Sequence, residues 1–195
     1  MNLNDHYHPL LLKQVPEGAR TALDVGCGTG GFARLLAERG LDAEGMDSHA
    51  DVIEAARAAG GGPRYRRADV REARLPDGHY DFISCIASLH HMPFDTVLTL
   101  RRALAPGGVL AVLGLYEART PADFAWALPG LFLLTADRLR SRRRPAQAVQ
   151  VPLVWPPPLS YAETRTESAR LLPGSTLRRL LFWRYLLVYR AGGTG

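Results

Sequence analysis

Along the first 116 residues of the chain, short continuous apolar runs take turns with stretches in which the apolar residues have helical spacing. Short apolar runs predict buried strands at residues 21–26, 41–47, 63–70, 80–88 and 109–116. Helical spacing between these runs predicts helices at 31–40, 48–60 and 94–108, the last with Leu104 on its buried face. Strands that alternate with helices indicate a parallel sheet, and strands that are apolar on both faces indicate helices on both sides of it.

Two segments predict helix starts of the capping-box type. Ser48 with Asp51 begins the helix at 48–60, and Ser160 with Glu163 begins a further helix near the end of the chain. In such a box, each side chain accepts a hydrogen bond from a backbone N–H group that the helix leaves unpaired.

The chain changes character between residues 117 and 159, where it is irregular and rich in proline. Beyond this segment, residues 175–191 predict two strands that meet near Trp183, although the first half of that range also fits a helix. No internal repeat or second domain is visible, so we expect one domain over residues 1–195. The apolar residues of the irregular segment either wall a pocket or belong to the core: Phe124, Trp126, Leu128, Leu131, Phe132 and Trp155.

The composition is that of an ordinary globular domain. Hydrophobic residues make up 47% of the 195 residues and charged residues 22%. No apolar run reaches 18 residues, and the first residues lack the basic and apolar parts of a secretory signal. We therefore expect a cytoplasmic protein without a membrane span, in which Cys27 and Cys85 are free thiols.

The formal net charge of +5 raises the question of nucleic-acid binding. Lys13 is the single lysine and arginine supplies the remaining positive charge, a bias typical of GC-rich coding rather than of a selected basic surface. One cluster stands out, "RLRSRRR" at residues 138–144. It fits a solvated connector, or a contact with an anionic substrate, a membrane surface or RNA.

The segment "LDVGCGTGG" joins the first predicted strand to the first predicted helix through glycines. Such a turn lets a ligand approach the backbone at a helix N-terminus. The absence of a following Lys-Ser or Lys-Thr excludes a P-loop, whereas Gly26, Gly28 and Gly31 with Asp47 fit a dinucleotide site. Asp24 favours a cationic ligand such as S-adenosylmethionine, because a carboxylate would repel a pyrophosphate. Asp24 also fits the simpler role of capping the turn.

With these motifs in order, the chain resembles the class I S-adenosylmethionine-dependent methyltransferases over nearly its whole length. The segments that carry the resemblance are "LDVGCGTGG", "GMDSH", "ADV", "YDFISCIASLHHM" and "LAPGGVLAV". The resemblance implies that Asp24 lies near the methionine amino group, that Asp47 binds both ribose hydroxyls and that Asp69 accepts the adenine amino group. The residues expected around this cofactor, or its product S-adenosylhomocysteine, are Asp24, Gly26, Cys27, Gly28, Gly30, Asp47, Ser48, Asp69, Val70 and Cys85.

The same resemblance implies a fold and a domain plan. The fold is an α/β, Rossmann-like, doubly wound sheet of seven strands, mostly parallel, with an antiparallel C-terminal strand pair. The irregular segment at 117–159 falls where relatives insert a substrate cap, so we expect that role for it.

Histidines supply the candidate bases for a methyl transfer. His90 and His91 follow the fourth predicted strand, at the end where open α/β sheets bind ligands, and we expect their side chains to diverge. His6 and His8 belong to an N-terminal segment, residues 1–18, that either folds over the cofactor as a lid or packs on the surface. All four also fit structural roles. No ligand spacing indicates a metal site.

The sequence thus predicts an enzyme that methylates a small, apolar or aromatic acceptor, on oxygen in preference to nitrogen or carbon. The sequence contains nothing that resembles a separate RNA-binding domain, and this argues against nucleic acid as the acceptor. Two alternatives stay open: an RNA methyltransferase guided by the cluster at 138–144, and a relative that binds the cofactor without transferring a methyl group. The oligomeric state is not set by these patterns.

Overall fold

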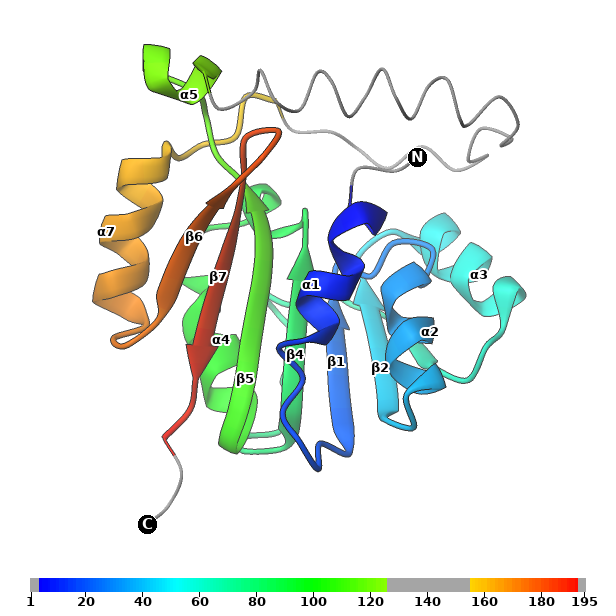
Figure 1. The fold of residues 1–195 in the computed structure, drawn as a ribbon. Coiled ribbons are helices and arrows are strands. Elements are labelled where there is room, and N and C mark those ends of the chain that lie inside the picture. The colour runs from blue at the N-terminus through cyan, green and yellow to red at the C-terminus, as the bar shows by residue number, and fades with distance from the viewer. Residues whose placement is uncertain (1–3, 126–154, 193–195) are drawn as a thin grey trace.

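The computed structural model describes residues 4–125 and 155–192. Within them lies a seven-stranded sheet in the order β3-β2-β1-β4-β5-β7-β6 (Figure 1). Strands β1 to β5 run parallel, and β7 is antiparallel to both of its neighbours. The predicted α/β fold, with its antiparallel C-terminal pair, is confirmed. The strands are β1 Thr21–Val25, β2 Asp42–Asp47, β3 Arg64–Arg67, β4 Tyr80–Ile86, β5 Leu104–Leu115, β6 Thr176–Leu180 and β7 Arg184–Arg190.

Helices cover both faces of the sheet, as the apolar strands predict (Figure 1). On one face, α1 and α2 pack against the sheet; on the other, α4 and α7 do so. Helix α3 packs against α2 and the edge strand β3. The helices are α1 His8–Leu12, α2 Gly31–Glu38, α3 Ala50–Ala59, α4 Thr96–Ala103, α5 Pro121–Ala125 and α7 Tyr161–Leu171, with 3₁₀ turns η1 Asp5–Tyr7 and η2 Leu89–His91.

Strand β5 shows how the sequence builds the two layers. Leu110 and Val112 are fully buried in the cluster under α4 and α7, whereas Ala111 and Leu113 are fully buried under α1 and α2. Successive side chains of a strand point to opposite faces, so a continuous apolar run buries residues on both. This run accounts for the central position of β5 in the sheet.

The boundary between α4 and β5 differs from the prediction. Leu104 was expected on the helix, but α4 ends at Ala103 and Leu104 is the first residue of β5, paired with Tyr80. The register then shifts, and the next pair joins Phe82 to Val109. The prolyl ring at position 106 disfavours a helical conformation of the preceding residue, so the chain leaves the helix earlier than its apolar spacing indicates.

One of the two predicted capping boxes is present. Ser160 Oγ accepts a hydrogen bond from Glu163 N, and the Glu163 carboxylate accepts one from Ser160 N at 2.7 Å. The box at Ser48 and Asp51 was wrong, because α3 begins at Ala50 and its N-cap makes no side-chain hydrogen bond.

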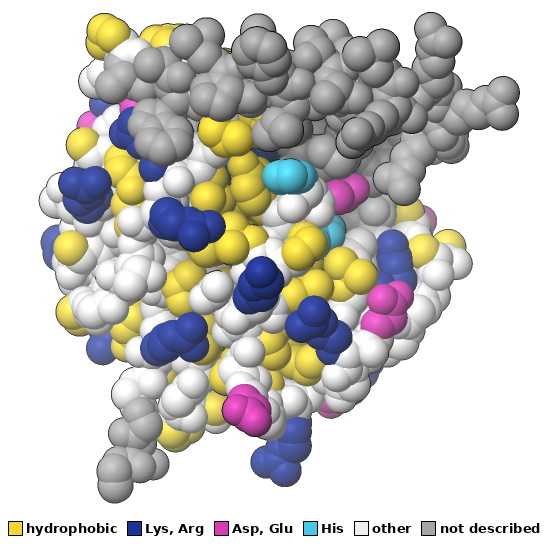
Figure 2. Space-filling view, in the orientation of Figure 1, with side chains coloured by type: hydrophobic (Ala, Val, Ile, Leu, Met, Phe, Trp, Pro, Cys, Tyr) yellow, Lys and Arg dark blue, Asp and Glu magenta, His cyan; other side chains and the backbone are white. Residues whose placement is uncertain are grey.

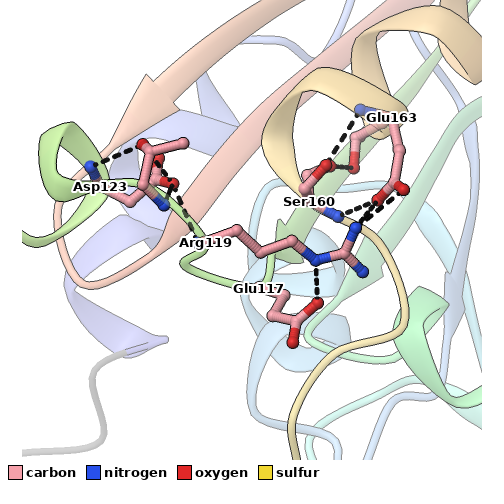
Figure 3. Close-up of polar contacts among 7 residues, drawn as sticks. Glu117, Arg119, Asp123, Ser160 and Glu163 are labelled. Atoms are coloured by element: carbon pink, nitrogen blue, oxygen red, sulfur yellow. Dashed lines mark hydrogen bonds and ion pairs between the residues drawn. The ribbon is translucent and has the colours of Figure 1, made fainter.

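The Ser160 box is part of a wider contact that joins two distant parts of the chain (Figure 3). Arg119 contacts both Glu117 and the Glu163 carboxylate, the latter at 2.8 and 2.9 Å. The backbone of Glu117 also pairs with Ser160 as an isolated bridge. The two ends of the predicted cap insertion are therefore held side by side, while most of that insertion and the cluster at 138–144 lie outside the described residues.

The carboxyl ends of β1, β2, β4 and β5 meet at one edge of the sheet, at the top of Figure 1. We call it the carboxyl edge. The first residue of β7, Arg184, pairs with the last residue of β5, so it lies at the same edge. In the part of the chain that the structure describes, no helix combines the length and the apolar character needed to cross a membrane.

Candidate functional site

Asp24 lies at the carboxyl edge, on the next-to-last position of β1, and its residue surface is only 2% exposed. Its carboxylate accepts a hydrogen bond from Ser84 Oγ at 2.7 Å. Burial and, less strongly, the nearby charge of Asp47 raise the pKa of Asp24 to about 7, against the lowering effect of the Ser84 hydrogen bond. The Ser84 bond leaves further acceptor positions of the carboxylate for a ligand.

The glycine turn between β1 and α2 is shaped partly by the protein's own packing. A Cβ atom on Gly26 would lie 2.3 Å from Ser88 Cβ, and one on Gly30 would lie 2.2 Å from the Tyr65 hydroxyl oxygen. Gly30 is also the N-cap of α2, with a left-handed φ of 78°. These two positions therefore require glycine to let neighbouring side chains approach the backbone.

Gly28 differs from these two, because a Cβ atom there would meet nothing within 4 Å. Its N–H donates to Asp47 Oδ2 at 3.1 Å, which joins the glycine turn to the end of β2. Asp47 Oδ1 accepts from His49 N at 3.1 Å and also contacts His49 Nδ1, and the Asp47 side chain is only 10% exposed. The open space therefore lies next to a nearly buried carboxylate.

Other predicted cofactor residues come after β2 and β3 along the chain. Asp69 is ion-paired with Arg71, whose side chain holds the pKa of that carboxyl below its usual range. Val70, next to Asp69, is buried in the core under α4. Ser48 is exposed and its Oγ lies 3.2 Å from His49 Nδ1.

Both cysteines are buried free thiols. Cys27 lies in the glycine turn and Cys85 at the end of β4, where its Sγ lies 2.9 Å from Ser88 Oγ. Burial raises the pKa of both thiols, that of Cys85 to about 12, so each is neutral near pH 7. Neutral thiols in such surroundings act as small apolar groups and not as nucleophiles.

His90 and His91 were expected to diverge, and this was wrong. Their ring centroids lie 4.1 Å apart with the planes tilted by 41°. Both belong to the 3₁₀ turn η2, in which neighbouring side chains are about 120° apart and not on opposite sides as in a strand.

The two rings differ in their surroundings. His90 is only 8% exposed, and neither ring nitrogen has a hydrogen-bond partner among the described residues. Burial, with the nearby charges of His91 and Arg184, lowers the pKa of His90 to about 4. His91 is exposed, and burial of part of its ring with the charge of His49 lowers its pKa, while Asp47 raises it. The pKa of His91 thus responds to Asp47, and that of His90 to Arg184.

The N-terminal histidines lie on the face covered by α1 and α2. His8 is the first residue of α1, and its ring centroid lies 5.0 Å from that of Phe32. Burial lowers the pKa of His8. His6 is exposed beside Tyr7, whose side chain belongs to the core with Leu11. Residues 5–12 therefore pack on the domain, and a lid role for segment 1–18 stays a prediction.

The aromatic residues predicted to wall a pocket are only partly described. Phe124 and Trp155 are 55% and 56% exposed, and both rings contact that of Trp183, at centroid distances of 6.5 and 6.1 Å. They form an exposed aromatic group and are not core. The other four, Trp126, Leu128, Leu131 and Phe132, lie outside the described residues.

Charged side chains do not gather into one basic patch on the face seen in Figure 2, where the arginines are scattered between apolar residues. Among residues 4–125 and 155–192, no group of three or more potential ligand residues is placed to hold a metal ion.

Four residues of this edge were not singled out from the sequence: Ser84, His49, Arg184 and Asn4. Ser84 is the register partner of Asp24, a relation that only strand pairing reveals. Arg184 follows an apolar run and is itself buried, with its guanidinium bonded to Asn4 Oδ1 at 3.1 Å. No short-range signal marks the contacts of Ser84 and Arg184, because they join segments 60 and 180 residues apart.

The side chains and backbone of this site fit one kind of ligand. Two nearly buried carboxylates, Asp24 and Asp47, flank a turn whose Gly28 position faces open space. Carboxylates bind ammonium groups and diols well, and they repel pyrophosphate. The residues present therefore fit an aminoacyl nucleoside such as S-adenosylmethionine.

Comparison with known proteins agrees with this chemistry. The family described as methyltransferase domain matches residues 23–112. The chain is 37% identical over 198 residues to an uncharacterized methyltransferase of Mycobacterium tuberculosis, and the match covers 97% of this chain and 96% of that protein.

Solved structures share the fold. A protein of Pyrococcus horikoshii matches 96% of this chain and 88% of its own, with a TM-score of 0.68 and 23% identity. An S-adenosylmethionine dependent methyltransferase of Mesorhizobium loti matches 96% and 99%, with a TM-score of 0.64 and 22% identity. The motifs, the fold and the full-length relative together show that this chain belongs to the class I S-adenosylmethionine-dependent methyltransferases.

Proposed function

We propose that this enzyme methylates an oxygen atom of a small-molecule acceptor at the carboxyl edge of the sheet. S-adenosylmethionine, when bound, supplies a methyl group from its positively charged sulfonium, and loss of this methyl group turns the sulfonium into a neutral thioether. The observation that carries the donor site of this proposal is the hydrogen bond from Gly28 N to Asp47 Oδ2, which joins the glycine turn to the acid at the end of β2.

In this proposal, Asp24 binds the amino group of the methyl donor and Asp47 binds its ribose hydroxyls. Asp69 and Val70 bind the adenine, and the backbone of Gly26, Cys27, Gly28, Gly30 and Cys85 surrounds the ligand with Ser48 at its margin. The buried position of Asp24 supports this assignment, because a charge-assisted hydrogen bond gains strength where water is excluded.

His91 is the proposed general base for an acceptor that carries a hydroxyl group. It is exposed at the carboxyl edge, in the turn that follows β4, and the charge of Asp47 acts to raise its pKa. His90 is a weaker base, since a pKa of about 4 lies far below neutral pH. His8 is the second choice, and His6 the last.

The names of two partial relatives support a small-molecule acceptor, and the name of one of them specifies transfer to oxygen. The chain is 33% identical over 137 residues to a ubiquinone biosynthesis O-methyltransferase of Marinobacter nauticus, a match that covers 63% of this chain and 56% of that protein. It is 39% identical over 107 residues to a trans-aconitate 2-methyltransferase of Azoarcus, covering 52% and 42%. A cytoplasmic location and the choice of a small molecule over RNA stay predictions.

The donor site is tested by substitution of Asp47. Asp47→Asn keeps the size of the side chain and removes its charge, so S-adenosylhomocysteine should bind at least tenfold more weakly, as expected when a charge-assisted hydrogen bond worth roughly 1.5–3 kcal/mol is lost. Asp51→Asn is the matched control, because Asp51 is an exposed acid on the neighbouring helix α3. Calorimetry that gives equal dissociation constants for the two variants would contradict the assignment of Asp47.

A further inference from the structure

Arg184 carries a positive charge at the carboxyl edge that the described residues do not neutralise. Its residue surface is 8% exposed, and its guanidinium donates only to neutral oxygens: Asn4 Oδ1 at 3.3 and 3.1 Å, and the Phe182 carbonyl at 3.1 Å. No carboxylate of the described residues forms an ion pair with it. Buried charges in proteins are normally paired, because loss of water is costly for an ion.

His90 presents a second unsatisfied polar group near this charge. Its residue surface is 8% exposed, and both ring nitrogens are buried without a hydrogen-bond partner among the described residues. His90 belongs to the turn η2 that follows β4, and Arg184 pairs with the last residue of β5, so both residues lie at the carboxyl edge, where the charge of Arg184 contributes to the lowered pKa of His90. Neutral imidazole offers one N–H donor, and the guanidinium has N–H groups that Asn4 and Phe182 do not use.

Two observations relate these residues to the donor site. The His91 ring lies against the His90 ring, with centroids 4.1 Å apart, and the charge of Asp47 acts to raise the pKa of His91. Arg184 lies on β7, three strands from β1, which carries Asp24. At the usual spacing of neighbouring strands, this is about 14 Å.

We propose that Arg184 and His90 bind a carboxylate group of the methyl acceptor. The inference rests on the proposed function, and it narrows the acceptor to a small organic acid. One guanidinium and one neutral imidazole match the single charge and planar shape of a carboxylate, whereas a phosphate dianion would keep an unpaired charge. The methionine carboxylate of the donor is a poorer occupant, because it shares one carbon with the ammonium group that Asp24 binds, about three strands away.

The test measures binding of small carboxylates in the presence of saturating S-adenosylhomocysteine. The probes are benzoate, phenylacetate and hexanoate, each compared with its own amide, which has the same shape without the charge. We expect at least one acid to bind tenfold or more tightly than its amide. Arg184→Met should abolish this preference and Arg184→Lys should reduce it. Arg190→Met, at the exposed far end of the same strand, should keep it.

Three results would overturn the inference: no acid preferred over its amide, a preference that survives in Arg184→Met, or a loss of S-adenosylhomocysteine affinity in Arg184→Met as large as the loss for the acid. Arg184→Lys keeps the buried charge and provides a folded variant if Arg184→Met does not melt cooperatively. Failure of S-adenosylhomocysteine to bind the unchanged protein would instead contradict the proposed donor site, so the two failures are distinguishable.

Discussion

Asp24 and Ser84 are register partners on the adjacent strands β1 and β4, and the Ser84 hydroxyl donates a 2.7 Å hydrogen bond to the Asp24 carboxylate. Because the two strands pair, the Ser84 hydroxyl lies next to the buried Asp24 carboxylate and can donate a hydrogen bond to it. The bond is not enough to offset burial, since the pKa of Asp24 is raised to about 7. Asp24 is therefore partly protonated at neutral pH in the absence of a ligand.

The first prediction concerns the pH dependence of donor binding. If the ammonium group of S-adenosylhomocysteine pairs with charged Asp24, only the deprotonated protein binds it well. Because the pKa of Asp24 is about 7, the dissociation constant should be about tenfold larger at pH 6 than at pH 8. Calorimetry across this range checks it, with Asp24→Asn as the control, which should bind weakly and without this dependence. An affinity that is constant from pH 6 to 8 would exclude the pairing.

The raised pKa of Asp24 also predicts how replacing Asp24 changes the free energy of unfolding at different pH values. The folded state raises the pKa of Asp24 above its unfolded value, so the folded protein holds the proton more tightly between about pH 4 and 7. The contribution of Asp24 to stability is then present at low pH and is lost as the pH rises through 7. Asp24→Asn should therefore stabilise the ligand-free protein at pH 8, by on the order of a few kcal/mol, and less at pH 5. Urea unfolding at the two pH values measures this, and a larger gain at pH 5 would contradict it.

Gly30 and Gly40 form a matched pair for testing the glycine turn. Both have a left-handed backbone, with φ of 78° and 86°, but a Cβ atom on Gly30 would lie 2.2 Å from the Tyr65 hydroxyl, whereas one on Gly40 would meet nothing within 4 Å. Gly40→Ala should cost about 1 kcal/mol of unfolding free energy from backbone strain. Gly30→Ala should cost clearly more, because Tyr65 must also move. Equal losses in urea unfolding would show that Tyr65 does not constrain the turn.

The two serines predicted to cap helices provide another comparison. Ser160→Ala removes a capping box and should cost about 1 kcal/mol. Ser48→Ala should change the unfolding free energy by much less, because Ser48 caps no helix. The order of the two losses in urea unfolding is the decisive quantity, and a greater loss in Ser48→Ala would contradict the structure of the α3 start.

The histidines are tested by methyl transfer from labelled S-adenosylmethionine to whichever acceptor is turned over. His91→Gln should lower kcat by on the order of 10²-fold or more if His91 removes a hydroxyl proton. His79→Gln is the matched control, since His79 is exposed beside the start of β4, at the opposite edge of the sheet. Donor affinity is measured in parallel. If substitution of His6, His8, His90 and His91 in turn leaves kcat near its original value, none of these four is the base, and the nucleophile is already deprotonated or carries no proton to remove.

The sequence predicted the sheet well because its signals are local. Continuous apolar runs such as that of β5, and the acids near the ends of β1 and β2, could be seen without any knowledge of pairing. Helix α1 was not predicted, because its five residues are too few for helical spacing to show, and burial of Leu11 against the sheet is what stabilises it.

The polar details of the site depend on contacts between distant segments. Arg184 follows an aromatic turn and would ordinarily be expected at the surface, yet pairing of β7 with β5 places it inside the carboxyl edge. The tilted stack of His90 and His91 follows from a 3₁₀ turn that no sequence pattern announced. Tertiary packing decides both, and single-sequence periodicity carries no information about it.

The most direct test of the donor site is a crystal structure of the protein with S-adenosylhomocysteine. The account predicts that the amino group of the ligand lies within hydrogen-bond distance of the Asp24 carboxylate and that both ribose hydroxyls donate hydrogen bonds to Asp47. The ligand should occupy the open space next to Gly28. A ligand bound elsewhere, or bound here with its amino group away from Asp24 and its ribose away from Asp47, would contradict it.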